Sequence, residues 1–216
     1  MGHYRIAGHH FLCAMIGILF SMNLQAQDRL KRVTFDVGAG FSFPTGQLGG
    51  HTKTGFNFVA SAGPRLNSRF SANLDFGLHY FNVKNSFENE GVNLSLGAVA
   101  RIWTLTINPA YQFLRREKFS SYATGGYGLY NRQLKIPFPD PIPMVACEAF
   151  WDACISSSPG GAFVTGNINP TKGGYNVGGG MNFGSHTKFF VEARYHHMFT
   201  SDSPTQFIPL TFGVRW

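Results

Sequence analysis

The stretch VTFDVGAGFSF, residues 33–43, alternates between apolar and polar side chains at every second position. Successive side chains of a β-strand point to opposite faces of the sheet, so a period of two predicts a strand with one apolar and one polar face. The apolar face would carry Val33, Phe35, Val37, Ala39, Phe41 and Phe43, and the polar face Thr34, Asp36, Gly38, Gly40 and Ser42.

The same pattern returns along the rest of the chain, at residues 56–66, 70–80, 103–113, 119–132, 175–183, 189–199 and 208–216. The segment 119–132 alternates poorly because it contains three glycines, and its faces stay unassigned. Leu94, Leu96 and Ala98 alternate in the opposite phase to the strand that follows them. We therefore expect a β-bulge or a loop extension near Ala100.

The connections between these segments alternate in length. Short turns are expected at 67–69, 115–117 and 184–187, and longer connections at 44–54, 84–100, 133–170 and 200–205. Short turns on one rim and longer loops on the other are typical of a meander closed on itself. The prediction is an all-β fold, an eight-stranded antiparallel up-and-down barrel.

The composition indicates which face of this barrel meets water. Only 13% of the residues are charged and 15% are aromatic, far from the quarter-charged composition of a soluble domain. The lumen of eight strands is just wide enough for side chains, so the large rings belong outside, and lipid accepts such an apolar band around a closed barrel. Aromatic residues at strand ends match the interfacial girdles of membrane barrels: Phe43, Phe56, Phe70, Tyr80, Trp103, Phe113, Tyr130, Phe199 and Trp216. A transmembrane barrel is favoured, and a soluble lipocalin-like carrier is the inverse arrangement.

The N-terminus is typical of an exported protein. Residues 1–26 contain one charge, then an apolar stretch, then an approximate cleavage site ending at Ala26. We predict a signal peptide at 1–26 and a barrel domain at 27–216. Cys13 would leave with the signal.

At its C-terminus the chain resembles a known family. The pattern Leu210, Phe212, Val214 and Trp216, together with the eight alternating segments, is similar to the eight-stranded OmpA/OmpX-like outer-membrane β-barrels of Gram-negative bacteria. The resemblance implies an outer-membrane location, contact with the lipid bilayer, and assembly by the barrel-assembly machinery that reads such a C-terminal signal. It implies no particular activity.

The polar faces place a cluster of charged and titratable residues in the lumen: Asp36, Asp75, His79, Glu192, Arg194 and His196. Buried charges must pair or neutralise, because a lone one costs several kcal/mol. A compensated plug is the favoured interpretation. The alternative is a narrow ion or proton path lined by the same residues.

The remaining charges do not point to nucleic acid. Ten basic residues, Arg215 among them, fall near the predicted short turns and form a basic rim without a nucleic-acid-binding module. Arg132 and five other basic residues fall on the outer loops, where acidic residues balance them. A solvated rim explains the charge better than a specific anionic partner.

Sequence motifs for catalysis or metal binding are also missing. His196 and His197 would point to opposite faces, and His51, His79 and His186 lack metal-ligand spacing. We expect no enzyme activity, no metal and no cofactor.

The connection 133–170 is longer than ordinary loops, which makes it the predicted seat of specific function. Cys147 and Cys154 would form a disulfide in an exported chain. That bridge would hold Phe150 and Trp151 at the tip of the loop, either exposed as binding candidates or folded down over the barrel mouth. The resulting hypothesis is a structural or adhesive role through the outer loops, with an unidentified extracellular ligand. The alternatives are a small ion or solute channel and the lipocalin-like carrier.

Overall fold

The computed structural model describes residues 33–84, 88–89, 92–93, 98–135, 146–148, 150, 153–158, 161–166, 170–200 and 204–216. The chain divides into two compact units, residues 1–33 and 34–216. The predicted signal peptide and its cleavage site lie outside the described residues, and the fold below is that of the second unit.

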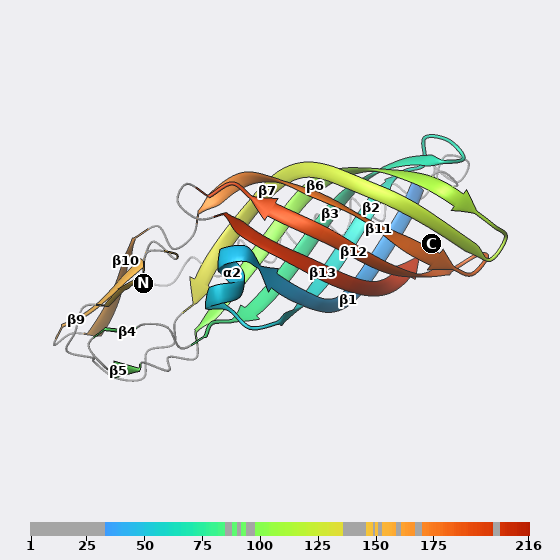
Figure 1. Cartoon of the computed structure of the whole chain (residues 1–216). Coiled ribbons are helices and arrows are strands. Elements are labelled where there is room, and N and C mark those ends of the chain that lie inside the picture. Colours follow the sequence, from blue (N-terminus) through green and yellow to red (C-terminus); the bar gives the residue numbers. More distant parts are fainter. Residues whose placement is uncertain are drawn as a thin grey trace, which may run out of the picture. The chain divides into compact units, whose positions relative to one another are not determined.

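Eight strands in the described part of the chain close into a barrel (Figure 1). They are β1 (Val33–Thr45), β2 (Gly55–Pro64), β3 (Phe70–Asn82), β6 (Val99–Arg115), β7 (Phe119–Lys135), β11 (Thr171–Phe183), β12 (Lys188–Met198) and β13 (Thr205–Arg215). The pairings from β2 through β3, β6, β7, β11, β12 and β13 to β1 are all antiparallel. The predicted up-and-down barrel is confirmed.

The remaining elements are short. The helix α2 (Gly46–His51), which the sequence pattern did not predict, follows β1. A two-stranded sheet pairs β4 (Glu88–Asn89) with β5 (Val92–Asn93), and a three-stranded sheet has the order β10 (Gly161–Gly166), β9 (Ala153–Ser158), β8 (Ala146–Glu148). No helix among the described residues is long and apolar enough to cross a membrane.

The two ends of the barrel differ as the connection lengths predict. The short-turn rim consists of residues 65–69, 116–118 and 184–187, together with the C-terminal Trp216; the long-loop rim consists of α2 and the ends of the strands joined by the longer connections. Asn67 stabilises the first short turn, because its side-chain oxygen accepts hydrogen bonds from the backbone N–H groups of Arg69 and Phe70, both at 2.8 Å.

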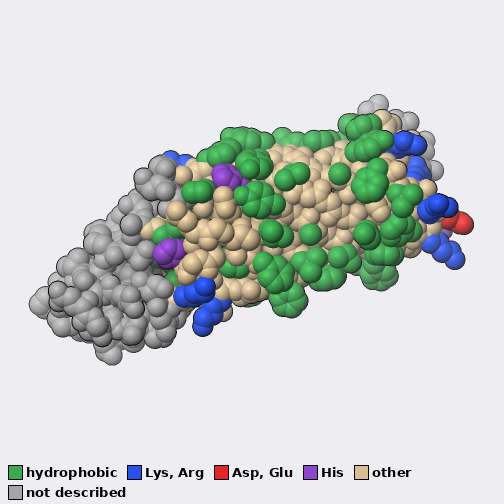
Figure 2. Space-filling model, in the orientation of Figure 1, with side chains coloured by type: hydrophobic (Ala, Val, Ile, Leu, Met, Phe, Trp, Pro, Cys, Tyr) green, Lys and Arg blue, Asp and Glu red, His purple; other side chains and the backbone are tan. Residues whose placement is uncertain are grey.

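Side chains alternate between a polar lumen and an apolar outer surface. Inward positions on β1 and β3 such as Asp36, Ser42 and Asp75 are buried. Outward residues such as Phe41 and Val177 expose more than half of their surface, and Figure 2 shows apolar side chains covering the barrel wall. A wide apolar band on a closed sheet is what hydrocarbon requires. The structure therefore contradicts the inverse, lipocalin-like arrangement.

The expected β-bulge near Ala100 is wrong, because β6 begins at Val99 and Ala100 pairs in regular register with Phe81 and Leu134. Ala98, Ala100 and Ile102 lie on the inward face in the same phase as the rest of β6, because an apolar cluster fills the lumen at the long-loop rim. The register shift occurs instead between Gln112 and Leu114, and it brings Arg115 opposite Ser120. Leu94 and Leu96 lie outside the described residues.

The structure also assigns the faces of β7 and corrects the predicted girdle. Tyr130 is fully buried in the lumen, and Tyr122 on the same strand is buried as well. Both rings fit because glycines lie beside them: a side chain on Gly174 would overlap with Tyr130, and one on Gly180 with Tyr122. The expectation that large rings lie on the outer surface is therefore wrong at positions where a neighbouring glycine leaves space in the lumen.

Two matched arginine substitutions test whether the apolar band faces lipid. Ile107 lies at the middle of β6 and Leu66 lies at the short-turn rim, yet their exposed fractions are nearly equal, 64% and 65%. Ile107→Arg should lower the free energy of unfolding by about 2–4 kcal/mol, and Leu66→Arg by about 0–1 kcal/mol, because the cost of a cation in a bilayer depends on depth. Urea titration of protein folded in lipid vesicles measures both. Equal losses would mean that the outer surface of the barrel faces water.

Candidate functional site: the polar lumen and its apolar cap

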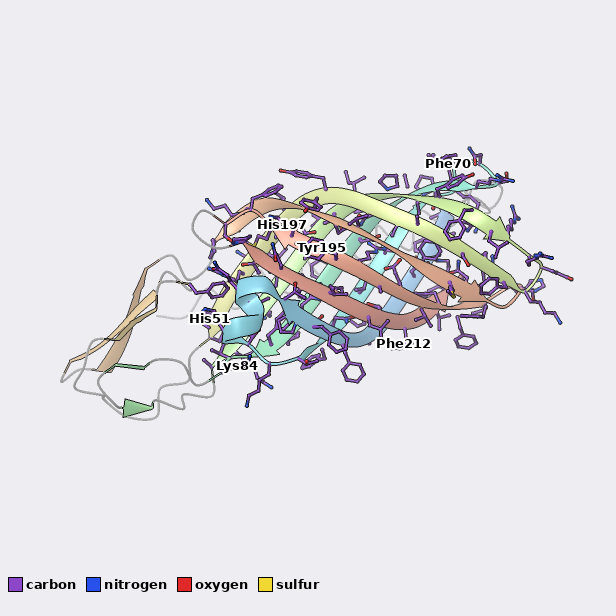
Figure 3. The ribbon with its side chains drawn as sticks, viewed as in Figure 1. His51, Phe70, Lys84, Tyr195, His197 and Phe212 are labelled. Atoms are coloured by element: carbon purple, nitrogen blue, oxygen red, sulfur yellow. The ribbon has the colours of Figure 1, made fainter. Side chains whose placement is uncertain are left out.

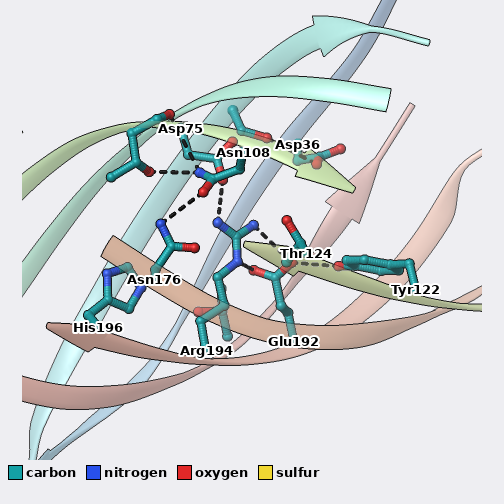
Figure 4. Close-up of polar contacts among 12 residues, drawn as sticks. Asp36, Asp75, Asn108, Tyr122, Thr124, Asn176, Glu192, Arg194 and His196 are labelled. Carbon is teal, nitrogen blue, oxygen red and sulfur yellow. Dashed lines mark hydrogen bonds and ion pairs between the residues drawn. The ribbon is translucent and has the colours of Figure 1, made fainter. Parts of the chain in front are cut away.

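Arg194 on β12 organises the charges at the centre of the lumen (Figure 4). Its guanidinium lies 2.5 Å from Asp75 Oδ2 and, through Nε, 2.6 Å from Glu192 Oε1. All three side chains are almost completely buried. The predicted residues Asp75, Glu192 and Arg194 therefore come together as one compensated ion cluster.

Neutral side chains complete this cluster. Tyr122 donates its hydroxyl to Glu192 at 2.7 Å, and Asn108 donates its amide to Asp75 at 2.8 Å. Asn176 donates in turn to the Asn108 oxygen at 2.8 Å. The polar network thus joins β3, β6, β7, β11 and β12 across the lumen. Asn108 and Asn176 are absent from the predicted lumen cluster, although their positions on the polar strand faces indicate that they point into the lumen.

A second ion pair lies toward the short-turn rim. Arg215 binds both oxygens of Asp36 through Nε and Nη2, each at 2.7 Å, and donates to Asn182 at 3.0 Å. Its guanidinium also lies over the Tyr122 ring, 4.9 Å from the centroid. The prediction that Arg215 belongs to a solvated rim is wrong, because odd-numbered residues of β13 face the lumen and Asp36 lies directly opposite in the register.

The predicted residues His79 and His196 form a third group toward the long-loop rim. Ser42 Oγ lies 3.0 Å from His79 Nδ1, and Tyr130 Oη lies 3.1 Å from His196 Nδ1. Phe207 stacks on His196 with ring centroids 4.9 Å apart. Both imidazoles are almost completely buried.

The lumen beside these groups is almost filled. A cavity of about 20 Å³ is lined by residues that include Asp75, His79, Glu192, Arg194 and His196. That volume suits about one water molecule. Asp75 Oδ1 and His79 Nε2, which have no hydrogen-bond partner among the described residues, belong to this lining. This cavity therefore has room for a water molecule but not for a larger solute.

An apolar cap fills the lumen at the long-loop rim. It consists of Leu48, Phe81, Ala98, Ala100, Ile102, Tyr130, Leu134, Phe150, Met198 and Phe207. Within the cap, Phe150 is 6% exposed and stacks on His51 at 4.4 Å between centroids. Phe150 is therefore not an exposed binding ring, because it folds down over the barrel mouth. Trp151 lies outside the described residues.

Arg132 fastens Phe150 to the barrel. Its Nη2 donates to the Phe150 carbonyl at 3.1 Å, its Nη1 donates to Thr205 at 3.0 Å, and its guanidinium lies 5.0 Å from the Phe150 ring centroid. The prediction that Arg132 is an outer-loop charge is wrong, because β7 extends to Lys135 and even-numbered residues face inward.

The two cysteines of the long connection lie opposite each other in the backbone register. Cys147 on β8 pairs with Cys154 on β9. Cα atoms of opposed antiparallel residues lie about 4.5–5.5 Å apart, within the range that a disulfide spans. Their side chains lie outside the described residues, so the disulfide stays a prediction.

The described residues offer little for catalysis. They hold no group of three or more His, Cys, Asp or Glu residues that could bind a metal. Ser42 and His79 are neighbours, but Ser42 is fully buried and no carboxylate orients the imidazole through a hydrogen bond. A nucleophile in this position would meet no substrate.

At the barrel seam, the C-terminal motif lies on the lipid side. Leu210, Phe212, Val214 and Trp216 share the outward face of the last strand, opposite the lumen residues Thr211 and Arg215. Their predicted role as an assembly signal stays a prediction.

Removing the central cation tests the ion cluster. Arg194→Met should destabilise the protein by about 3–5 kcal/mol, because Asp75 and Glu192 would remain buried without a counter-charge. Arg116→Gln on the exposed turn is the control and should change the stability by less than about 0.5 kcal/mol. Urea unfolding monitored by tryptophan fluorescence gives both values.

A second variant separates charge from packing. Combining Asp75→Asn and Glu192→Gln with Arg194→Met removes every charge of the cluster and should recover most of the lost stability. If the triple variant is as unstable as Arg194→Met alone, packing and not charge compensation holds the lumen together.

Comparison with solved structures identifies the same architecture. The neisserial surface protein A (NspA) superposes with a TM-score of 0.54 at 14% identity, covering 85% of this chain and 95% of that one. A major outer membrane protein of Thermus thermophilus gives 0.50 at 11% identity, with 85% and 98% covered. Ail, the attachment invasion locus protein of Yersinia pestis, gives 0.47 at 15% identity, with 86% and 98% covered. At these identities the likeness concerns the fold alone.

Sequence comparison gives the family. No curated protein sequence matches the chain. The family model described as outer membrane protein beta-barrel domain matches residues 11–215, nearly the whole chain. With a closed eight-stranded barrel, an apolar outer band and a polar lumen, the chain belongs to the outer membrane protein beta-barrel domain family.

Proposed function

We propose that this protein is an integral outer-membrane anchor with a structural or adhesive role, exercised through its long connections. One observation carries the proposal. The lumen is closed by paired charges around a cavity of about 20 Å³, whereas the connection between β7 and β11 contains a separate three-stranded sheet. The material available for recognition therefore lies outside the barrel.

The location and the route to it follow from the same features. The apolar band requires a bilayer, and the family is one of outer membrane proteins. We infer export through residues 1–26 and assembly through the outward motif that ends at Trp216. With this polarity the long-loop rim faces the cell exterior and the short-turn rim faces the periplasm.

The long connection has the features of a binding loop on a rigid scaffold. Phe150 fixes it to the cap, and the opposed cysteines would staple β8 to β9. A loop held in this way loses less conformational entropy when it binds a partner. The partner would be an extracellular molecule or surface, and the proposal assigns the protein no catalytic step.

Replacing the segment Cys147–Cys154 with a short Gly-Ser linker tests the adhesive role. Cells that display the wild-type protein should adhere to immobilised matrix proteins or glycans, and the loop variant should lose this adhesion because it lacks β8 and the stapled turn. The variant should still show heat-modifiable mobility on gels, which reports an intact barrel.

Two further variants sharpen this test. The same linker in place of residues 88–93, which removes the β4–β5 sheet, is the matched control and should keep adhesion. In the alkylated wild type, mass spectrometry should find both cysteines unmodified, because a disulfide protects them from alkylation. Cys147→Ser with Cys154→Ser should abolish this disulfide. Adhesion of the wild type no greater than that of cells without the protein would sink the proposal.

The competing channel hypothesis makes a different electrical prediction. Because the cluster around Arg194 leaves a cavity of only about 20 Å³, the protein in planar bilayers should show no ion current above the lipid baseline. Asp75→Asn should leave this baseline unchanged. A wild-type current that Asp75→Asn alters would show that the lumen conducts ions. The interpretation of the lumen as a closed plug would then be wrong, and the ion path would be correct.

A further inference from the structure

The outer wall of the barrel contains an apolar groove at the long-loop end of β1, β2, β3 and β6. Its volume is about 530 Å³, and it is lined by Phe41, Thr54, Gly55, Phe56, Tyr80, Asn82 and Val99. Phe56 and Tyr80 stack along it with ring centroids 4.9 Å apart. The groove therefore lies where the apolar band ends and polar side chains begin.

Four cations, here called the cationic fringe, are neighbours of the lining residues in sequence or in strand register. Lys53 precedes the lining residue Thr54, and Lys84 follows Asn82 by two positions. Arg101 is the register partner of Tyr80, and Lys135 is that of Val99. Figure 3 shows Lys84 beside His51 at this end of the barrel. The fringe thus spans four neighbouring strand ends.

Local contacts hold two of these cations in place. Lys84 Nζ donates to the Gly49 carbonyl of α2 at 2.6 Å, and the Arg101 guanidinium donates to Gln133 Oε1. Neither contact neutralises the charge. Lys84 keeps two of its three ammonium donors, and Arg101 keeps guanidinium donors that Gln133 does not use.

Among the side chains that the structure describes, no acidic residue lies at this rim. The acidic residues whose side chains the structure describes are Asp36, Asp75, Glu117 and Glu192. Three of them are buried in the lumen, and Glu117 lies on a short turn at the opposite end. Within the described part of the chain, the cations at this rim therefore have no carboxylate partner.

We propose that the groove and its fringe form a binding site for a phosphate-bearing lipid of the surrounding leaflet. The acyl chain would lie against Phe41, Phe56 and Val99, and the phosphate would accept hydrogen bonds from Lys84 and Arg101. Charge-assisted hydrogen bonds to phosphate are among the strongest that a protein makes, and apolar contact below them fixes the depth of the lipid.

The position of the groove excludes the other obvious occupants. It opens on the face that meets hydrocarbon, so a hydrophilic peptide would be desolvated there at high cost. A second copy docked by the same surface would bring two cationic fringes together, and like charges repel. An anionic amphiphile satisfies both the apolar wall and the cationic edge.

Native mass spectrometry of the full chain in a zwitterionic detergent tests the site. The probes are dioleoyl phosphatidic acid, dioleoyl phosphatidylcholine and inorganic phosphate. The wild type should retain phosphatidic acid about tenfold more tightly than phosphatidylcholine, which corresponds to about 1.4 kcal/mol. Lys84→Gln with Arg101→Gln should lose this preference. Arg116→Gln with Lys118→Gln, on the short-turn rim, should keep it.

A second variant tests the groove itself. Val99→Trp should fill the groove and weaken the binding of both lipids, while heat-modifiable mobility confirms that the barrel is folded. Equal retention of the two lipids by the wild type would overturn the proposal, as would a preference for phosphatidic acid that survives the Lys84 and Arg101 substitutions. Displacement of the lipid by an equimolar amount of inorganic phosphate would show a simple anion site in place of a lipid site.

Discussion

Backbone pairing between β13 and β1 closes the sheet, and the rest of the structure depends on this contact. The register runs from Asp36 opposite Arg215 to Thr45 opposite Gln206. Without it, two strand edges would present unpaired N–H and C=O groups to hydrocarbon, at several kcal/mol for each group. The outward face of β13 can then be apolar, because the backbone N–H and C=O groups of the strand are already paired. The same register also places Arg215 beside Asp36, so the seam is held by an ion pair as well.

Closure with only eight strands dictates the chemistry of the interior. The lumen is too narrow for bulk water, so each charge that enters it needs a partner at contact distance. Arg194 between Asp75 and Glu192 meets this requirement near mid-lumen, and Arg215 with Asp36 meets it near the short-turn rim. Toward the long-loop rim the interior is mostly apolar, and the buried Arg132 there donates hydrogen bonds to Thr205 and to the Phe150 carbonyl.

The fold and most lumen residues could be predicted from the period of two, because strand faces depend on parity alone. Asp36, Asp75, His79, Glu192, Arg194 and His196 all lie inside, as parity requires. The prediction was wrong for two residues that were assigned to the barrel rims and not to a strand face. Arg132 and Arg215 lie within the predicted strands 119–132 and 208–216, but their nearness to the strand ends assigns them to the rims; in the structure their positions on β7 and β13 turn both arginines inward. Tyr130 was misplaced for another reason, since the gap that Gly174 leaves on the neighbouring strand is a property of register and not of sequence order.

The cap links the barrel to its longest connection, and packing outweighs chain entropy in this link. Anchoring Phe150 divides the connection between β7 and β11 into two shorter closures, but halving a loop changes its closure free energy by only about 0.6 kcal/mol. Burial of a phenylalanine side chain contributes about 1.5–3 kcal/mol, and the stacking on His51 and the cation–π contact with Arg132 add to it. Within the described part of this connection, Phe150 is therefore a buried point of attachment to the barrel. Under the proposed adhesive role, that attachment would hold the connection in place when it meets a partner.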